Sequence, residues 1–274
     1  MKLPSLKVVI LTPVVAFIIF YVFVAILLYF RDPPTVAPVS SASPPLEVAI
    51  FGASGTAGDG ILQAAIESKD IKHINVITRR ITPRMEAGVN DGKLTVSQHM
   101  DYLDYSSVLP QLSAVDAVYW AIGISSLGVD EETYGLIHVD FPRAFVKEWL
   151  GVSGKDEISF HFISSSDISE DSNTMWIREK IRAEKTLFEL AADSKLRVIA
   201  YRPDYIAPTE AEAHLGQDML YWFFKPVGAA VKARQIGQAM IDVSLREPRF
   251  ENGSKLSTGK IVMHSNAYET IDRP

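Results

Sequence analysis

The chain has 274 residues, a formal net charge of −6 at pH 7 and no cysteine. The lack of cysteine excludes disulfides, thiolate metal sites, iron–sulfur clusters and cysteine nucleophiles. With 47% apolar and 22% charged residues the chain is neither disordered nor fibrous, and its acidic balance argues against a nucleic-acid partner. The histidines show no HExxH or HxH spacing, so we expect no metal site.

The N-terminus begins with an uncharged apolar run that covers residues 8–30. A helix of this length spans roughly 35 Å, which is enough to cross the hydrocarbon core of a bilayer. A cleaved secretory signal is the alternative, but the run is longer than the apolar region of a typical signal. We therefore expect residues 1–30 to be a retained single-pass anchor in the lipid bilayer.

Residues 31–45 contain five prolines and three serines and show no apolar periodicity. Such a segment favours extended polyproline conformation and spans roughly 45 Å when fully stretched. We expect it to be a linker between the anchor and a single domain, residues 46–274. With 24 basic and 32 acidic residues, this domain has a charge of −8.

The domain alternates short apolar runs with amphipathic ones. Strands are expected at residues 46–52, 73–80, 93–99, 115–123, 158–166, 196–203 and 261–264. Helices are expected at residues 58–68, near 106–112, 132–150 and 174–194. Because the strands are apolar on both faces and alternate with helices, they predict a parallel sheet covered on both sides. We therefore expect a Rossmann-like, doubly wound α/β fold.

A glycine-rich turn with GxxGxxG spacing joins the first predicted strand to the first helix. In dinucleotide-binding turns, glycines allow a tight bend, close approach of a pyrophosphate and close packing of the helix on the sheet. The helix N-terminus adds amide donors and partial positive charge. A purely structural turn is the alternative. The residues expected to bind the cofactor here are Gly52, Ser54, Gly55, Thr56 and Gly58.

The second predicted strand ends in Arg79 and Arg80, with Arg84 nearby. An NAD site has an acidic residue at this place, which accepts a hydrogen bond from the ribose 2′-hydroxyl. Guanidinium groups suit a 2′-phosphate instead. We therefore expect NADP(H) as the cofactor; the alternative is that both arginines are solvated on a surface turn.

Several segments, taken together and in this order, resemble the short-chain dehydrogenase/reductase superfamily. More narrowly, residues 46–274 are similar to its atypical branch of small NADPH-binding proteins, which includes the Tat-interacting-protein-like oxidoreductases. The segments are GASGTAG (52–58), ITRR (77–80), VDAVYWAIG (115–123), FHFISSSD (160–167), an aromatic-xxx-Lys step (176–180) and YRPDYI (201–206).

The resemblance implies roles for individual residues. It places Ala121 and Gly123, with Ile122 between them, against the cofactor, and Asp101 against the adenine. It makes Ser165, beside Ser164, the group that polarises a substrate carbonyl, and it makes Lys180 a ligand of the nicotinamide ribose. The alternatives are that the serines cap a helix and that Asp101 starts a turn.

The chain departs from the family pattern at the step that normally reads Tyr-xxx-Lys and here runs from Trp176 to Lys180. In the family the lysine lowers the pKa of the tyrosine one helical turn away, and the tyrosine donates a proton as hydride arrives. An indole cannot do so near neutral pH. Three explanations remain open: a shifted alignment, a substitute donor (Tyr205, Tyr134 or a water on Ser165), or cofactor binding without turnover.

Residues 219–224 are six consecutive large apolar side chains. A core-facing helix buries about three to four positions in two turns, so some of the six must face elsewhere. We expect Trp222 and Phe223 to line a pocket for a small lipophilic substrate or to form a patch that contacts the membrane. A fully buried helix is the alternative.

The expected function is a membrane-anchored NADP(H)-binding oxidoreductase that acts on a carbonyl or alcohol. A non-catalytic sensor, scaffold or assembly factor is the alternative, and a sugar-nucleotide epimerase is less favoured because it also needs the missing tyrosine. Lys2 and Lys7 before the anchor, against Arg31 after it, weakly favour export of the domain. Because the NADP(H) pool that this fold uses is chiefly cytosolic, we nevertheless expect the domain to face the cytosol.

Overall fold

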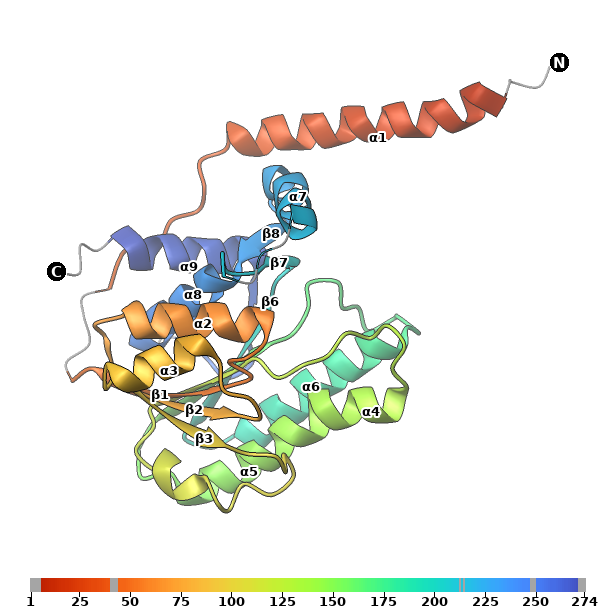
Figure 1. Ribbon diagram of the computed structural model, residues 1–274. Coiled ribbons are helices and arrows are strands. Elements are labelled where there is room, and N and C mark those ends of the chain that lie inside the picture. Colours follow the sequence, from red (N-terminus) through yellow and green to blue (C-terminus); the bar gives the residue numbers. More distant parts are fainter. Residues whose placement is uncertain (1–5, 40–43, 212, 214, 247–249, 271–274) are drawn as a thin grey trace.

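The computed structural model describes residues 6–39, 44–211, 213, 215–246 and 250–270, with the backbone alone for residues 6–10. The expectations for Lys2 and for part of the linker, residues 40–43, therefore lie outside the described residues. The described part of the domain consists of a parallel sheet with helices on both faces, and α1 and α7 lie together at the top in the view of Figure 1.

The main sheet has seven strands in the order β3-β2-β1-β4-β5-β6-β9, and every neighbouring pair is parallel. The predicted Rossmann-like, doubly wound fold is confirmed. The strands are β1 Leu46–Phe51, β2 Ile71–Thr78, β3 Leu94–Gln98, β4 Ala117–Trp120, β5 Ile158–Ile163, β6 Leu196–Arg202 and β9 Ser254–Ser257. A second, two-stranded parallel sheet pairs β7 (Tyr205–Ala207) with β8 (Ala230–Lys232).

Helices α2, α3, α8 and α9 cover one face of the main sheet, and α5, α6 and the short turn η1 cover the other (Figure 1). The alternation of β1 shows why both faces need cover: Val48 and Ile50 enter one apolar cluster, and Ala49 and Phe51 enter the other. The helices are α2 Thr56–Glu67, α3 Pro83–Asn90, η1 Leu109–Leu112, α4 Glu131–Gly135, η2 Leu136–Asp140, α5 Phe141–Val152, α6 Met175–Ala191, α7 Leu215–Phe224, η3 Lys225–Val227, α8 Ala233–Leu245 and α9 Thr258–Thr270.

The strand expected at residues 261–264 is wrong, because these residues lie inside α9. Ile261, His264 and Tyr268 are buried on one side of that helix, at the spacing of three and four residues that a helix requires. The last strand of the sheet is β9 instead, a short segment that pairs with β6. The helix expected at 132–150 is interrupted by the π-helical turn η2, and the helix expected near 106–112 is a single 3₁₀ turn.

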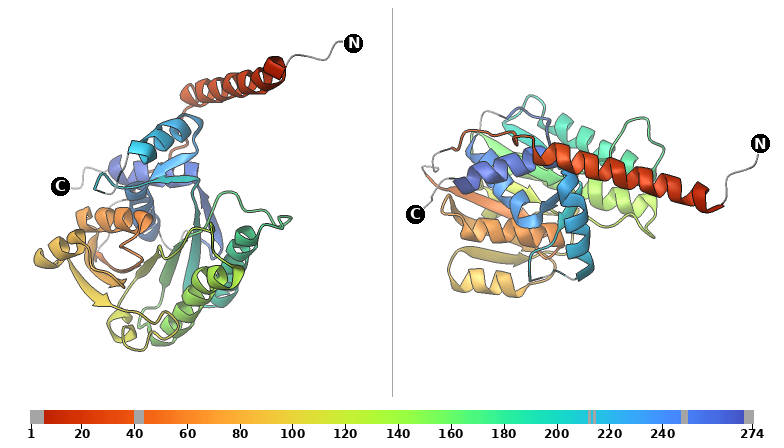
Figure 2. Two further views of the ribbon diagram at one scale, coloured as in Figure 1. Left: turned by 45° about the vertical axis from the view of Figure 1, so that its right-hand side comes forward. Right: turned by 90° about the horizontal axis from the view of Figure 1, so that it is seen from above.

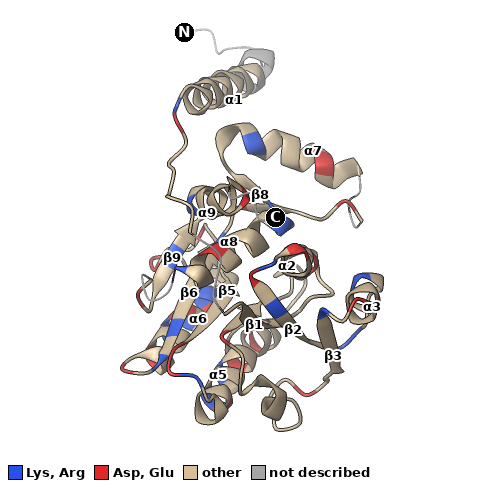
Figure 3. Cartoon of the chain, turned by 90° about the vertical axis from the view of Figure 1, so that its left-hand side faces the viewer, with Lys and Arg blue, Asp and Glu red and all other residues tan. Residues whose placement is uncertain are grey.

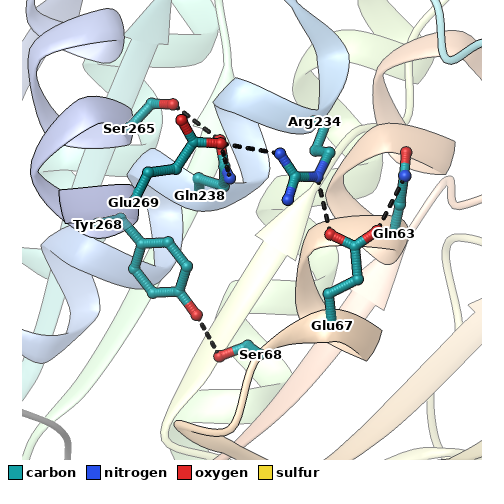
Figure 4. A network of polar contacts seen from close by, with 8 residues as sticks. All are labelled: Gln63, Glu67, Ser68, Arg234, Gln238, Ser265, Tyr268 and Glu269. Atoms are coloured by element: carbon teal, nitrogen blue, oxygen red, sulfur yellow. Dashed lines mark hydrogen bonds and ion pairs between the residues drawn. The ribbon is translucent and has the colours of Figure 1, made fainter. Parts of the chain in front are cut away.

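Helix α9 is attached to α2 and α8 by the polar network of Figure 4. The Tyr268 hydroxyl donates a hydrogen bond to Ser68 Oγ at 2.6 Å. The Arg234 guanidinium donates to Glu67 at 2.7 Å and to Glu269 at 2.9 Å, so it joins all three helices. A cavity of about 370 Å³ lies among these residues, and its main charges are paired with one another. The network therefore has a structural role.

Helix α1 (Leu6–Tyr29) contains Leu11–Tyr29, which is the one stretch among the described residues long and apolar enough to cross a membrane. None of that stretch is buried against the domain. The segment after α1 is attached to the domain, because the buried Arg246 guanidinium donates to the carbonyl oxygen of Ala37 at 2.6 Å. Arg246 is paired with buried Asp242, which also contacts His264 Nδ1 at 2.7 Å.

Close packing of α2 on α8 gives a stability prediction for Gly60. A Cβ at this position would lie 2.3 Å from the carbonyl carbon of Ala233, which is backbone and cannot move aside easily. We expect Gly60→Ala to lower the free energy of unfolding by about 1 to 3 kcal/mol, measured by chemical denaturation. Gly259→Ala in α9, where no atom lies within 4 Å of the new Cβ, is the control and should be neutral or slightly stabilising. Equal effects of the two changes would contradict the packing argument.

Candidate functional site

The glycine-rich turn lies between the carboxyl end of β1 and the start of α2. Gly52 has a φ of +77°, in the left-handed region, and a Cβ there would lie 2.7 Å from the carbonyl carbon of Ala121. A Cβ on Gly58 would lie 2.0 Å from the carbonyl oxygen of Gly52. Only glycine at these two positions lets the turn pass between α2 and the residues that follow β4.

The N-terminus of α2 is open to solvent. Gly55 is its capping residue, no side chain caps the helix, and Gly55 and Thr56 are exposed. The first amide groups of the helix therefore lack intrahelical acceptors, and they carry the positive end of the helix dipole. Such an end binds phosphate groups well, so the turn fits the pyrophosphate of a dinucleotide.

Two exposed arginines follow β2 beside this turn. The Arg80 guanidinium donates to the carbonyl oxygen of Ser54 at 3.2 Å, which brings its charge to the glycine-rich turn. Arg84, by contrast, is bound by the buried carboxylate of Asp59 through two hydrogen bonds of 2.7 and 3.0 Å. Arg79 and Arg80 are thus available to a phosphate, whereas the charge of Arg84 is neutralised.

Asp101 lies in the loop after β3, where it is exposed. Its carboxylate accepts a hydrogen bond from the backbone amide of Leu103 at 3.0 Å, which is an ordinary turn contact. Ala121 and Gly123, on either side of Ile122, form the loop after β4, because that strand ends at Trp120. The structure therefore brings the loops after β1, β2 and β4 to one edge of the sheet, which is where ligands bind in open α/β folds.

Ser164 and Ser165 follow β5 at the same edge, in different surroundings. Ser164 is buried and donates to Glu184 Oε1 at 2.7 Å, and Glu184 is also bound by Arg202 at 2.8 Å. Ser164 is therefore part of a structural network. Ser165 is only half-buried, and of the two hydroxyls it is the one that can face a ligand.

Lys180 is buried on α6, and its ammonium group has two neighbours. It donates to the carbonyl oxygen of Ile163, the last residue of β5, at 3.2 Å, and it lies 3.1 Å from His138 Nδ1. Burial lowers the pKa of Lys180 from 10.5 to about 8. The lysine therefore keeps its proton at neutral pH, but holds it less tightly than a lysine in water.

His138 lies in the π-helical turn η2, and its ring occupies space that a side chain at residue 123 would fill. A Cβ on Gly123 would lie 2.8 Å from His138 Cε1. Nδ1 of the ring lies 3.1 Å from the Lys180 ammonium group, and Nε2 lies 3.2 Å from both the backbone N–H and the carbonyl oxygen of Ile124. Burial first, and then the charge of Lys180, lower the pKa of His138 to about 3.

Trp176 lies in the first turn of α6, one helical turn before Lys180, and is half-buried. Residues four apart share a helix face, so Trp176 and Lys180 lie on the same side of α6.

Comparisons with known proteins agree with this arrangement. No protein-family model matches the chain. The chain is similar to the protein fmp52, mitochondrial, of Emericella nidulans, with 25% identity over 221 residues that cover 78% of this chain and 90% of the relative.

Among solved structures, a short-chain dehydrogenase/reductase from Saccharomyces cerevisiae aligns with a TM-score of 0.60 and 16% identity, over 78% of this chain and 96% of that one. BdcA in complex with NADPH aligns with a TM-score of 0.60 and 15% identity, over 77% and 92% of the two chains. A UDP-glucuronic acid 4-epimerase from Bacillus cereus, in complex with UDP-glucuronic acid and NAD, has a TM-score of 0.59 and 14% identity, over 78% and 77%.

This is the short-chain dehydrogenase/reductase fold. The two tyrosines that the sequence analysis names as candidate proton donors lie in different places. Tyr134 is buried and its ring lies 4.1 Å from that of His138, and burial raises its pKa to about 12. Tyr205 belongs to β7, and its hydroxyl donates to the carbonyl oxygen of Gln217 in α7. Tyr134 therefore lies beside His138, which contacts Lys180, and the hydroxyl of Tyr205 points toward α7.

Sequence reasoning missed two features of this short-chain dehydrogenase fold. The first is His138. Its ring lies against Gly123, a contact between residues far apart in the sequence that no spacing rule predicts. The second is a Tyr-xxx-Lys spacing at Tyr221 and Lys225. It lies on α7, after β6, with the lysine 5.5 Å above the tyrosine ring, whereas the family's step follows β5. A search of the sequence for that spacing would have found it.

The buried histidines give a prediction for the pH dependence of stability. Burial lowers the pKa of His138 and of His161 to about 3, below the value of about 6.5 for an unfolded histidine. Between these values the unfolded chain binds more protons, so the free energy of unfolding should fall as the pH is lowered from 6.5.

Denaturation at a series of pH values, with NMR titration of the imidazoles, measures this. His138→Asn keeps an acceptor for Lys180 and should reduce the pH dependence. Titration of both rings near pH 6.5 in the folded protein would contradict the prediction.

Proposed function

We propose that the chain is a membrane-anchored, NADP(H)-binding oxidoreductase of short-chain dehydrogenase type that acts on a carbonyl or alcohol of a small lipophilic molecule. The observation that carries the proposal is one edge of the sheet: it holds the open N-terminus of α2 after β1, Arg80 after β2, and Lys180 of α6 against the end of β5. The nicotinamide complexes among the structural neighbours support a dinucleotide at this edge.

The residues present fit NADP(H). Gly52 and Gly58 leave no side chain in the turn, and the amides at the start of α2 can take the pyrophosphate. Arg79 and Arg80 follow the end of β2, where a 2′-phosphate would lie, and their guanidinium groups are exposed. Residues 77–84 contain no Asp or Glu that could accept a hydrogen bond from a ribose hydroxyl. This favours NADP(H) over NAD(H).

In the proposed reaction the nicotinamide supplies or accepts a hydride. Ser165 orients the substrate oxygen by a hydrogen bond, and Lys180, held by the carbonyl oxygen of Ile163, binds the ribose hydroxyls. Trp176 excludes water from the same side of α6 but offers no proton. Because the pKa of Lys180 is about 8, its ammonium can pass a proton to the substrate oxygen, directly or through a water on Ser165, and regain one from solvent.

A second candidate function is cofactor binding without turnover, as a sensor, scaffold or assembly factor. Trp176, one helical turn before Lys180, favours it, because an indole at the position proposed for the family's tyrosine offers no proton. The two functions differ in one readily measured quantity, the oxidation of NADPH in the presence of lipophilic carbonyl compounds.

The cofactor preference is tested at Arg79 and Arg80. We expect the protein to bind NADPH more tightly than NADH, and expect the double change Arg79→Ala/Arg80→Ala to weaken NADPH binding selectively, by at most a few kcal/mol. Isothermal titration calorimetry measures both affinities. Arg143→Ala/Lys147→Ala removes the same charge from exposed positions of α5 and is the control. Equal affinities for NADPH and NADH in the unchanged protein would contradict the proposal.

The proton donor is tested at Trp176. If the indole only fills the place of the tyrosine, Trp176→Tyr should create or raise NADPH-dependent reductase activity without changing NADPH affinity. Trp176→Phe supplies an aromatic ring without a hydroxyl and is the matched control. Weaker NADPH binding in the tyrosine variant would mean instead that the indole stacks on the nicotinamide. If neither activity nor affinity changes, the alignment of α6 with the family is wrong.

The membrane part of the proposal rests on α1, because no residue of its apolar stretch is fully buried. The mitochondrial name of the Emericella relative agrees with a protein of an internal membrane. We propose that the domain faces the cytosol. Protease added to sealed organelles with their cytosolic face outward should digest the domain. Protection of the domain until detergent is added would reverse the assignment.

A further inference from the structure

Helix α7 contacts the domain with one side only. The hydroxyl of Tyr205 in β7 donates to the carbonyl oxygen of Gln217 at 3.1 Å, and its ring lies 5.8 Å from that of Phe224. Gln217, Tyr221 and Phe224 are half-buried and follow one another at helical spacing. No residue of α7 is fully buried. The sequence-based alternative of a fully buried helix is therefore wrong.

The opposite side of α7 is apolar and faces outward. Leu215, Met219 and Trp222, spaced by four and three residues, are 87%, 73% and 68% exposed. Leu220 and Phe223 extend this stripe and are nearly half exposed. A soluble domain rarely leaves so many large apolar side chains together in water, and such a patch marks a surface that something covers.

Helix α1 lies directly beside this stripe. The ring of Tyr21 stacks on that of Phe223 at 5.1 Å, and its hydroxyl donates to the carbonyl oxygen of Phe223 at 2.6 Å. Seen from above in Figure 2, α1 crosses α7 on the same side of the domain. Because the described side chains of α1 are apolar all round, α1 has no face suited to water.

We propose that α7 is a second membrane-contacting element, which lies with Leu215, Met219 and Trp222 in the boundary between headgroups and acyl chains, beside α1. This inference rests on the proposed anchoring by α1: a helix that places Tyr21 in a bilayer brings Phe223 to the same surface. A lipid surface thus covers the apolar stripe, because α1 anchors the chain in the membrane and holds α7 beside it.

The charges around α7 suit that position. Figure 3 shows α1 almost free of charged residues, whereas α7 has one acidic residue, Asp218, in its first turn and is followed by Lys225. Lys225, at the end of α7, lies 5.5 Å above the rings of Tyr221 and Trp222, and Lys232 lies 5.9 Å above Tyr221. Aromatic rings at headgroup depth, with lysines that reach toward phosphates, are typical of helices in a membrane interface.

A cavity of about 1160 Å³ lies under α7, and its lining includes Trp222, Lys225 and Lys232 together with Thr209 and Arg84. Its walls are mixed polar and charged rather than apolar. Trp222 is among the residues that line this cavity and is 68% exposed, whereas Phe223 is not among them, so the expected apolar pocket wall stays a prediction.

The absence of cysteine makes a direct test possible in the full chain. Single changes to cysteine, each labelled with an environment-sensitive fluorophore, are placed in the full-length protein reconstituted into phosphatidylcholine vesicles. Met219→Cys reports on the outer face of α7, and Ile19→Cys on α1. Gln217→Cys reports on the domain-facing side of α7, and Lys147→Cys, on α5, reports on a water-exposed surface. Emission is quenched in turn by a nitroxide-labelled lipid and by aqueous iodide.

We expect the label at Met219 to be quenched several-fold more by the lipid quencher than by iodide, as at Ile19, and the label at Lys147 to show the reverse. The label at Gln217 should lie between them. A label at Met219 that behaves like Lys147, while Ile19 remains in lipid, would overturn the role of α7 and leave the anchor intact. Protection of Met219 from both quenchers would also overturn it, because another protein surface would then cover α7. Exposure of Ile19 to iodide would overturn the anchor itself.

Discussion

The close approach of α2 to its neighbours is the constraint on which the rest of the structure depends. At Gly58 and Gly60 a side chain would meet backbone atoms at 2.0 and 2.3 Å, and at Gly237 in α8 it would meet the Cβ of Ala64 at 2.7 Å. These contacts hold α2 between the sheet and α8. Because α2 is held there, its open N-terminus points to the edge where β1, β4 and β5 end, and the candidate site can form.

Much of this arrangement follows from local sequence. The strands β1 and β4 are nearly continuous apolar runs, and the glycine-rich turn is recognised by its position between a strand and a helix. The last strand could not be predicted from local sequence. Residues 261–264 are too few to distinguish the two-residue period of a strand from the 3.6-residue period of a helix. The small sheet of β7 and β8 was missed for a similar reason: each of its strands has only three residues.

The candidate site divides in the same way. Residues on turns with a known chemical demand, such as Gly52 and Arg80, can be proposed from sequence. His138 cannot, since its contact with Lys180 joins residues 42 positions apart and depends on the π-helical turn that aims the ring. The pairing also has an energetic consequence. A buried ammonium is costly, and here it is offset by a carbonyl oxygen and a neutral imidazole rather than by a direct carboxylate contact, which leaves its proton weakly held.

The attachment of Ala37 to Arg246 changes how the chain between α1 and the domain behaves. Only residues 30–36 remain between the end of α1 at Tyr29 and this fixed point at Ala37, and an extended segment of that length spans about 22 Å. The domain therefore does not sample a large volume above the bilayer. The short tether keeps the effective concentration of the domain at the lipid surface high. The weak contacts of a single amphipathic helix, α7, are then sufficient to keep one face of the domain turned toward the membrane.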